Sequence, residues 1–276
     1  MDLNTVKEVK RPESAEAVIW RDGYAWLAGG TWLFSEPQPA IDTLIDLENL
    51  RWPALHSSEN GLDIAATCRI VELDQFVAPP HWTAAPLLHM CCRSLLASFK
   101  IWNTATVGGN ICLSLPAGSM ISLTTALEGT YTLYPRDAEP RQVQAIDFVT
   151  GNHENVLQPG ELLRNIFIPS TALTRRFAIR RSSLTHLGRS AVLLIGTQNL
   201  HENDLLLTIT ASTKRPVQLR FQQLPAADEL RHCLATTIPD DLYCNDVHGT
   251  LAYRRHLTCY YAEQIRSELA QKGSGI

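Results

Sequence analysis

Two short segments of the chain combine glycines with hydroxyl or amide side chains, a combination that can bind anions through the backbone. The first is Ala28-Gly29-Gly30-Thr31, and the second is Thr106-Val107-Gly108-Gly109-Asn110. A Gly-Gly pair can adopt positive φ and has no Cβ to block the approach of a ligand. Successive backbone N–H groups can then point into one concavity and hold an anion. Two such turns in one chain predict a diphosphate that is held from two sides.

Each turn alone is weak evidence for a ligand. Neither is followed by the Gly-Lys-Ser/Thr of a P-loop, and neither has the spaced triple glycine of a dinucleotide-binding strand–turn–helix unit. Taken singly, a glycine-rich segment is more often an ordinary tight turn than a binding site. The diphosphate interpretation therefore depends on the presence of both turns and on the elements around them.

Other residues with catalytic potential lack the neighbours that catalysis needs. His153 and His186 have no partner at i+4 of the kind found in metal sites. Ser182-Ser183 has no His/Asp pattern nearby that would mark a nucleophile. The run Tyr253-Arg254-Arg255 is interpreted as part of a helix that packs and pairs charges. We expect no catalytic acid, base or nucleophile in this chain.

The seven cysteines do not form a disulfide or metal-binding pattern. They stand at positions 68, 91, 92, 112, 233, 244 and 259, an odd number without a framework spacing. Such scattered cysteines are usually small buried hydrophobic residues in a reducing compartment. We therefore predict neither a metal ion nor an iron–sulfur cluster in this chain.

Composition restricts the class of partner. Hydrophobic residues make up 45% of the 276 residues and charged residues 19%, which allows a sizeable core. The net charge of −4 includes no basic block, so a nucleic acid or an anionic membrane is not expected as a partner. The first ten residues lack the apolar core of a secretory signal, and no apolar run reaches the roughly 18 residues that span a bilayer. The expected location is the cytoplasm.

The elements that would position the glycine turns are short strands and helices. A buried strand at residues 24–28 runs into the first turn, and a helix at residues 86–99 delivers the chain to the second. The remaining elements of the first unit are strands at 43–47, 62–66, 131–134 and 165–169 and a helix at 119–128. From about residue 171 three strands, at 177–180, 191–195 and 205–210, precede a helical tail, so we place a domain boundary between residues 169 and 174.

Several motifs occur in a specific order. After Ala28-Gly29-Gly30-Thr31-Trp32-Leu33 come Thr43-Leu44-Ile45-Asp46-Leu47 and the segment from Asn103 to Asn110. Then follow Ser114-Leu115-Pro116-Ala117-Gly118, residues 157–163 and Arg180-Arg181, and the last match is residues 249–257. Together they resemble the FAD-binding subunit of the molybdenum hydroxylases, the family of xanthine dehydrogenase, aldehyde oxidoreductase and the carbon monoxide dehydrogenase medium chains. The resemblance covers nearly the whole chain.

The resemblance implies an α+β fold of two domains. Residues 1–170 would form a two-lobed FAD-binding domain of the PCMH/vanillyl-alcohol-oxidase type, with lobes at about 1–52 and 53–170. Residues 171–276 would form a smaller domain of the carbon monoxide dehydrogenase flavoprotein type, with a three-stranded sheet and helices.

The same resemblance implies which residues contact FAD. The first turn would lie along the diphosphate and the ribityl chain, and the second would cross the other side of the diphosphate. Apolar contacts to the adenine or the ring would come from residues 162 and 163, and a basic residue before the Arg180-Arg181 pair would sit near the flavin. The implied contacts are Ala28, Gly29, Gly30, Thr31, Trp32, Leu33, Thr106, Gly108, Gly109, Asn110, Ser119, Leu162, Leu163 and Arg176.

Three positions depart from the family pattern. Ser119 stands where an acidic residue commonly binds FAD hydroxyls, and it can offer only a neutral hydrogen bond. Leu96 stands where some relatives stack an aromatic ring on the flavin. Trp32 is bulky at a position that is often acidic or small. These departures are expected to lower the affinity for FAD.

The implied function is electron transfer within a multi-subunit enzyme. A molybdopterin-binding large subunit would oxidise the substrate and a [2Fe–2S] subunit would relay electrons. FAD in this chain would then pass them to NAD or another acceptor. One alternative is a diverged assembly or scaffolding subunit with weak or no FAD binding. A free-standing flavin reductase is disfavoured, because the match at residues 249–257 belongs to the multi-subunit family.

Overall fold

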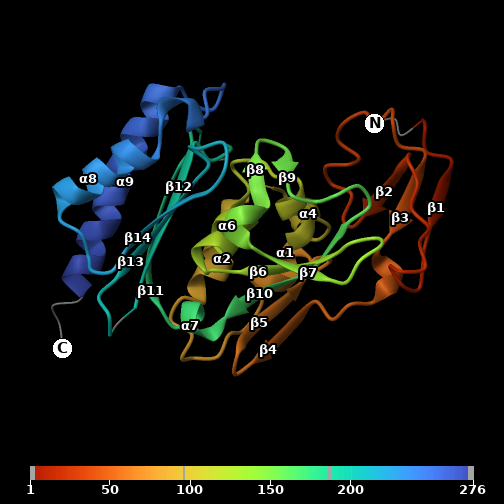
Figure 1. Cartoon of the computed structure of the whole chain (residues 1–276), viewed down its shortest axis with the longest axis horizontal. Coiled ribbons are helices and arrows are strands. Elements are labelled where there is room, and N and C mark those ends of the chain that lie inside the picture. The colour runs from red at the N-terminus through yellow and green to blue at the C-terminus, as the bar shows by residue number, and fades with distance from the viewer. Residues whose placement is uncertain (1–3, 96, 186–187, 200, 273–276) are drawn as a thin grey trace.

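The computed structural model describes residues 4–95, 97–185, 188–199 and 201–272. These residues form three parts that follow one another along the longest axis of the molecule (Figure 1). A small parallel sheet lies at the N-terminal end, an antiparallel sheet with its helices in the middle, and a second antiparallel sheet with two helices at the C-terminal end. This arrangement confirms the predicted α+β fold class.

The N-terminal sheet brings the first glycine turn to its edge. It contains β1 (Glu8–Lys10), β3 (Thr43–Asp46) and β2 (Tyr24–Leu27) in that order, all parallel. The β-branched and aliphatic residues of β3 are buried, which favours its central place. The strands predicted at 24–28 and 43–47 are confirmed, and the chain enters the first glycine turn directly after β2.

The central sheet has the strand order β4-β5-β10-β6-β7, and all neighbouring pairs are antiparallel. Its strands are β4 (Leu55–Ser58), β5 (Gly61–Ala65), β6 (Thr130–Tyr134), β7 (Arg141–Gln144) and β10 (Leu162–Pro169). A small hairpin of β8 (Val149–Gly151) and β9 (Glu154–Asn155) stands apart from this sheet. The associated helices are η1 (Glu48–Leu50), α1 (Ile70–Asp74), α2 (Pro86–Ser94), α3 (Phe99–Trp102), α4 (Val107–Cys112), α5 (Ser119–Ala126) and α6 (Ala145–Phe148).

The helix predicted at residues 86–99 is shorter than expected. It ends at Ser94, because Leu95 takes an extended conformation and its carbonyl oxygen accepts a hydrogen bond of 3.1 Å from the indole of Trp102. That bond turns the chain back, and the separate short helix α3 then leads toward the second glycine segment. The predicted helix at 119–128 is confirmed as α5, whose residues are all buried.

The C-terminal sheet has four strands, where three were predicted. Strands β11 (Arg176–Ser182), β12 (Val192–Gln198), β13 (Leu205–Thr210) and β14 (Val217–Phe221) pair antiparallel in chain order. The fourth strand was missed because it is short and its polar residues alternate with apolar ones, as expected of an edge strand. The helices of this part are α8 (Ala227–Thr237), η2 (Asp240–Leu242) and α9 (Leu251–Lys272). Helix α7 (Ser170–Leu173) connects it to the central sheet and packs against β5 and β10.

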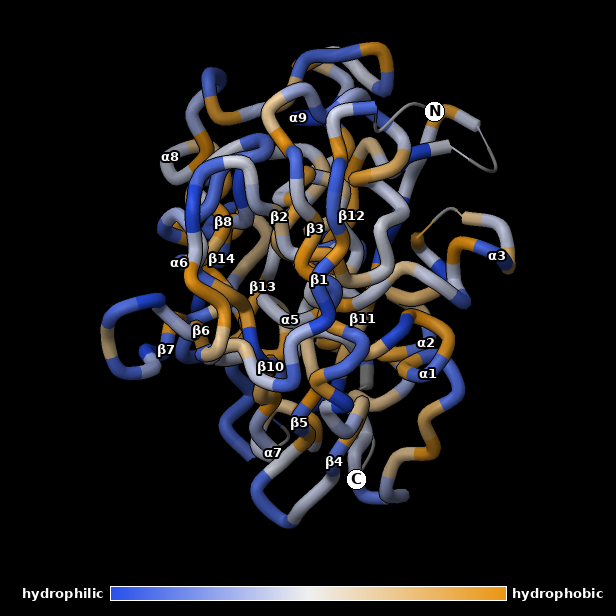
Figure 2. Tube along the Cα trace, turned by 90° about the vertical axis from the view of Figure 1, so that its right-hand side faces the viewer, coloured by the Kyte–Doolittle hydropathy of each residue, from blue (hydrophilic) through white to orange (hydrophobic). Residues whose placement is uncertain are grey.

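The C-terminal sheet lies between two helices that come from different parts of the chain. Helix α9 covers its outer face (Figure 1), and α5 of the middle part packs against β12 and β13. The hydroxyl groups of Ser122 and Thr210 meet at 2.6 Å across this second contact. Apolar residues gather in the strands, whereas the peripheral loops are hydrophilic (Figure 2). Among the described residues no helix is both long and apolar enough to cross a bilayer.

Candidate functional site

The second glycine segment is the first turn of a helix rather than an open loop. Thr106 is the N-cap of α4, and its Oγ1 accepts a hydrogen bond of 3.0 Å from the N–H of Gly109. The N–H groups of Val107 and Gly108 donate to the carbonyl oxygens of Cys68 and Ala66 at 2.8 and 2.9 Å. The expectation that this segment offers several free N–H groups to an anion is therefore wrong, because its own fold uses them.

The first glycine segment has the free donors that the second lacks. Within the described part of the chain, no backbone N–H group from residue 28 to 33 donates a hydrogen bond to another residue. Gly30 has a φ of 67°, which only glycine adopts easily, and its carbonyl oxygen accepts from Phe34 N–H at 2.8 Å. The segment therefore presents a row of unpaired donors, as an anion-binding nest does.

Glycine allows the two segments to approach each other. A Cβ built on Gly29 would lie 1.9 Å from the carbonyl oxygen of Thr104, so the backbones of the two segments are in direct contact there. A Cβ on Gly108 would lie 2.5 Å from the Ala66 Cβ. By contrast, a Cβ on Gly109 would come within 4 Å of the hydroxyl of Thr106 only. Gly29 and Gly108 are thus required for packing, and Gly109, apart from a 2.9 Å approach of such a Cβ to the Thr106 Oγ1, faces open space.

That open space is a cavity of about 630 Å³, named here cavity 1. It is lined by both glycine segments and by the loop that precedes α5, and its other walls come from the α2–α3 region and from the residues just before β12. The sequence-predicted residues among its lining are Ala28, Gly29, Gly30, Thr31, Trp32, Leu33, Thr106, Gly109 and Asn110.

A second cavity of about 520 Å³, cavity 2, adjoins the first. Both cavities are lined by Leu27, Ala28, Gly29 and Thr106, so the glycine segments form a wall common to the two. Cavity 2 carries more charge than cavity 1, and its charged lining residues are Asp46, Glu48, Arg51, Arg69 and Glu72. The pair of cavities suits an elongated ligand whose anionic middle lies at the shared wall.

Two polar side chains near cavity 1 have hydrogen-bonding capacity to spare. The Oδ1 of Asn110 accepts a hydrogen bond of 3.1 Å from the N–H of Met120, which leaves the amide NH₂ free to donate. Ser119, the first residue of α5, is 1% exposed, and its hydroxyl has no partner among the described residues. A buried hydroxyl without a partner is costly, and this one lies next to Gly118, which lines cavity 1.

Cys112 also lines cavity 1, yet it is not a nucleophile. Burial raises the pKa of its thiol to about 12, so the reactive thiolate is not populated at neutral pH. This agrees with the interpretation of the cysteines as small buried hydrophobic residues. Cys68, Cys91, Cys92 and Cys244 are buried as well, and all seven cysteines are free.

An aromatic contact joins the first glycine segment to the β8–β9 hairpin. The ring of Trp32 lies against that of His153, with centroids 5.5 Å apart and an interplanar angle of 36°. His153 is at the tip of the β8–β9 hairpin, where it adopts a φ of 61°. Trp32 therefore fits its place in the first segment by packing against a residue far along the chain.

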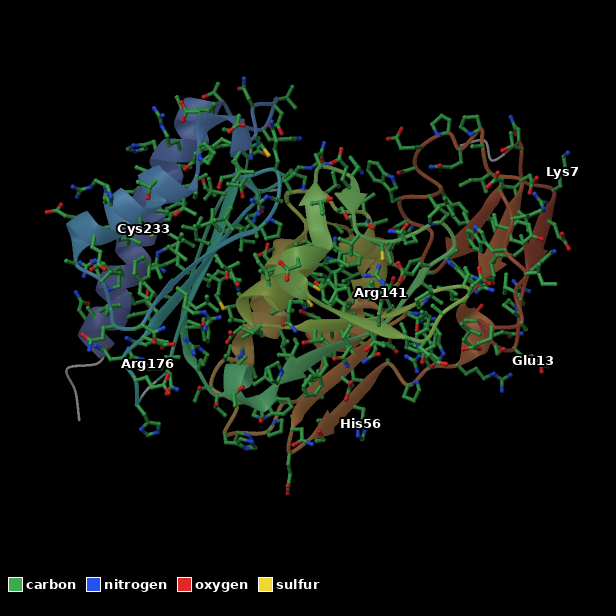
Figure 3. All side chains as sticks on the ribbon, in the orientation of Figure 1. Lys7, Glu13, His56, Arg141, Arg176 and Cys233 are labelled. Atoms are coloured by element: carbon green, nitrogen blue, oxygen red, sulfur yellow. The ribbon has the colours of Figure 1, made fainter. Side chains whose placement is uncertain are left out.

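The structure does not bring every predicted contact to these cavities. Leu162 and Leu163 are buried in two hydrophobic clusters, and neither lines cavity 1 or cavity 2. Arg176 lies in the C-terminal domain beside the end of α9 (Figure 3), where its guanidinium donates to the carbonyl oxygen of Leu269 at 3.2 Å. Leu96 lies outside the described residues, as does His186.

The sequence-based prediction missed the residues that the C-terminal part of the chain contributes. Arg189 and Ser190 line cavity 1, and they stand immediately before the apolar run that becomes β12. A charged and a hydroxyl residue at the start of a fully buried strand was the available signal. Asp46 of cavity 2 gave a similar signal, since it is the one charged residue of the predicted strand at 43–47.

More than half of the chain matches a known protein family. Residues 7–171 match the family model described as the FAD binding domain in molybdopterin dehydrogenase. Xanthine dehydrogenase of Oryza sativa subsp. japonica is 28% identical over 128 residues, which cover 43% of this chain and 9% of that protein. The glyceraldehyde dehydrogenase medium chain of Sulfolobus acidocaldarius is 29% identical over 174 residues, which cover 61% of this chain and 60% of that chain.

The fold is also that of a solved structure. A chain of the reconstituted CO dehydrogenase from Oligotropha carboxidovorans superposes with a TM-score of 0.81 at 19% identity, covering 97% of this chain and 98% of that chain. The chain thus spans only 9% of the length of the xanthine dehydrogenase and 60% of that of the glyceraldehyde dehydrogenase medium chain.

Proposed function

The chain belongs to the family of FAD-binding domains of molybdopterin dehydrogenases, and on this basis we propose that cavities 1 and 2 together hold one FAD. The diphosphate lies at the wall that the two cavities share, against residues 28–33. The row of unpaired N–H groups there is the observation that carries this proposal. These donors replace the hydration of the phosphate oxygens without a basic side chain.

The second segment contributes side chains and space instead of backbone donors. The Thr106 hydroxyl accepts from Gly109 N–H and keeps its own proton for a phosphate oxygen. The free NH₂ of Asn110 and the unpartnered hydroxyl of Ser119 are suited to the polar ribityl chain, which carries several hydroxyl groups. The residues present therefore fit the group, and the proposed contacts are Ala28, Gly29, Gly30, Thr31, Trp32, Leu33, Thr106, Gly109, Asn110 and Ser119.

The two cavities differ in a way that orients the ligand. Cavity 1 is lined mostly by apolar residues, among them Leu95, Ile101 and Leu113, and suits the broad flat isoalloxazine ring. Cavity 2, with Asp46 and Arg69 in its lining, suits the adenosine, whose base and ribose carry many hydrogen-bonding groups. Each cavity has the volume typical of a small-molecule site, about 300–1,000 Å³.

In the assembled enzyme we propose that this chain is an electron-transfer subunit. FAD would supply the redox chemistry, and the residues of the chain would bind it, orient it and exclude water from the ring. A [2Fe–2S] subunit would donate the electrons and a molybdopterin-binding large subunit would oxidise the substrate, with NAD or another acceptor at the end. The support is the family match and the likeness to a dehydrogenase medium chain.

We also propose that the chain folds as two domains, residues 1–170 and 171–276. The support is the separation of the apolar residues into two main clusters, one around the central sheet and one between the C-terminal sheet and helices α8 and α9. Helix α7 connects them, directly after the last residue of β10.

The test is the visible spectrum of the purified chain, measured alone and in its complex. Flavin bands with nearly one FAD per chain are expected, and extraction followed by chromatography would identify FAD. Absence of flavin from the intact complex would contradict the proposal. It would favour the alternative of a scaffolding subunit, which predicts that the complex assembles and reduces its acceptor after the flavin is stripped.

A further inference from the structure

Cavity 1 has a single charged residue among the described residues that line it, and that residue is Arg189. Its guanidinium takes part in none of the ion pairs or hydrogen bonds between described residues. An arginine without a counter-charge at the wall of an otherwise uncharged cavity presents a net positive charge to whatever fills that cavity. Arg189 comes from the C-terminal part of the chain, whereas the glycine segments that line the same cavity come from much earlier in the sequence.

The backbone around Arg189 is held on both sides. The neighbouring Arg181 donates from Nε to the Ser190 hydroxyl and from Nη2 to the Gly188 carbonyl oxygen, both at 2.7 Å. Burial lowers the pKa of Arg181, which shows that its guanidinium is taken partly out of water to make these contacts.

A second arginine fixes the next residue. Ala191 donates its N–H to the carbonyl oxygen of Ser182 at 2.8 Å, and its own carbonyl oxygen accepts from the buried Arg254 at 2.7 Å. Two arginines are therefore used to anchor the backbone on either side of a third. The third, Arg189, is the one without a partner among the residues that the structure describes.

We propose that Arg189 sets the reduction potential of the bound flavin. This inference rests on the proposed binding of FAD with its ring in cavity 1. Reduction of an oxidised flavin by two electrons and one proton leaves one negative charge on the ring, shared between N1 and the C2 carbonyl oxygen. A guanidinium at the cavity wall stabilises that charge and has no equivalent charge to stabilise in the oxidised ring. Arg189 therefore favours the reduced state, and it is not needed to hold the oxidised one.

The test compares Arg189→Gln with the wild-type full chain, both reconstituted with FAD. The two-electron midpoint potential is measured by stepwise reduction with dithionite against a reference dye. At a given potential, the ratio of reduced to oxidised flavin is expected to fall about tenfold, a shift of roughly 30 mV to lower potential. The dissociation constant for oxidised FAD, from fluorescence quenching, is expected to stay the same.

Two further variants complete the design. Arg189→Lys keeps a positive charge at the cavity and is expected to restore most of the potential. Arg231→Gln removes one positive charge from an exposed position on α8 in the same domain and is expected to leave the potential unchanged. It therefore controls for net charge.

The outcomes separate this inference from the proposed function. If the wild-type chain and every variant fail to bind FAD, the proposed function is wrong. If FAD binds but Arg189→Gln keeps the wild-type potential, the role of Arg189 is wrong. Loss of FAD from Arg189→Gln alone would also overturn it, since the guanidinium would then hold the oxidised flavin.

Discussion

The indole Nε1 of Trp26 donates a hydrogen bond of 3.1 Å to the carbonyl oxygen of Gly160, which is 134 positions later in the chain. Trp26 is the third residue of β2 and lines cavity 1, so this bond joins the N-terminal sheet to the turn that leads into β10. Gly160 can make it because its φ is 76°, and because a Cβ at this position would lie 2.6 Å from the ring of Trp20. The first glycine segment is thus held in place from the distant side of the FAD-binding region.

Gly160→Ala is expected to loosen this connection. The substitution adds a Cβ against the Trp20 ring and places alanine at positive φ, and such substitutions cost on the order of 1–3 kcal/mol. The free energy of unfolding, measured in urea, should fall by that amount, and FAD should bind more weakly. Gly249→Ala, also at positive φ but just before α9 and remote from Trp26, is a control that should destabilise the chain without the same loss of FAD. Equal effects of both variants on FAD would contradict a specific role for the Trp26–Gly160 bond.

Gly109→Val tests the diphosphate site. A Cβ at this position would lie 2.9 Å from the Thr106 Oγ1 and nothing else within 4 Å, so the N-cap hydroxyl must shift while the added methyl groups occupy part of cavity 1. We expect a loss of stability of about 1 kcal/mol, as for the loss of an N-cap, and a loss of FAD affinity of at least about 100-fold, equivalent to roughly 2.7 kcal/mol. Gly108→Ala is the contrasting variant. It should lower the melting temperature more than Gly109→Val does and weaken FAD binding less, because its Cβ meets Ala66 at 2.5 Å. Tight FAD binding by Gly109→Val would show that the second segment is not part of the site.

Thr106→Val separates the hydroxyl from the shape of the side chain. It removes the N-cap acceptor of α4, which should cost about 1 kcal/mol of stability, and it removes the donor proposed for the phosphate. The affinity for FAD should fall about fivefold to tenfold, as expected for one neutral hydrogen bond. Thr106→Ser keeps the hydroxyl and should retain both properties in urea unfolding and fluorescence titration. A Thr106→Ser protein that behaves like Thr106→Val would contradict the assignment.

Acid stability should depend on Glu161. Burial opposes the charge of this carboxylate, but hydrogen bonds from the Arg141 guanidinium at 2.7 Å and from Gln158 N–H at 2.9 Å outweigh it, so its pKa is lowered. A lowered folded-state pKa stabilises the protein fully above the unfolded-state pKa of about 4.3, and this stabilisation disappears as the pH falls through the folded-state pKa. Glu161→Gln should therefore be less stable at neutral pH and lose less stability between about pH 5 and pH 3.

The measurement for Glu161 is urea unfolding at a series of pH values. The exposed Glu154 has the same charge on the nearby β8–β9 hairpin, so Glu154→Gln serves as the matched control and should follow the wild-type pH profile. Arg141, the ion-pair partner of Glu161, lies in the middle part of the molecule (Figure 3). If Glu161→Gln follows the wild-type profile as well, the ion pair does not contribute to acid stability.

Arg254 should be one of the most sensitive positions for folding. It is 2% exposed and donates to the carbonyl oxygens of Gly249, Ala191 and Ala211 at 3.1, 2.7 and 2.6 Å. Arg254→Met leaves buried acceptors unpaired and should cost about 3–5 kcal/mol. The neighbouring Arg255 makes only a surface ion pair with Asp240. Arg255→Met should therefore cost less than about 1 kcal/mol. Similar unfolding midpoints for the two variants would refute this difference.

The sequence predicted the elements well wherever a short apolar run carried the signal. The strands beside the first glycine segment, the helix at residues 119–128 and the order of the two glycine segments could all be predicted from local composition. What could not be predicted was which N–H groups remain free. The N–H groups of Val107 and Gly108 donate to the carbonyl oxygens of Cys68 and Ala66, respectively. These acceptors lie about 40 residues earlier, and no local pattern reveals such a pairing.

Residues contributed from a distant part of the chain were missed for the same reason. Arg189 reaches cavity 1 because β12 packs against α5 and because Arg181 holds its neighbours. Arg176 was chosen instead from its position before the Arg180-Arg181 pair, yet it lies at the opposite end of β11 from Ser182, which pairs with Val192. Antiparallel register decides which end of a strand faces the cavity, and a single sequence does not contain that register.

The separation between the glycine segment at residues 28–33 and its supports also orders events during synthesis. This segment leaves the ribosome before Thr104, Gly160 and Ser190, which complete its surroundings and follow roughly 70 to 160 residues later. At about 5–20 residues per second, several seconds pass before the nascent chain contains a complete pocket. Flavin incorporation is therefore expected only after residue 190 has been synthesised, and a chain truncated before residue 190 should emerge without its cofactor.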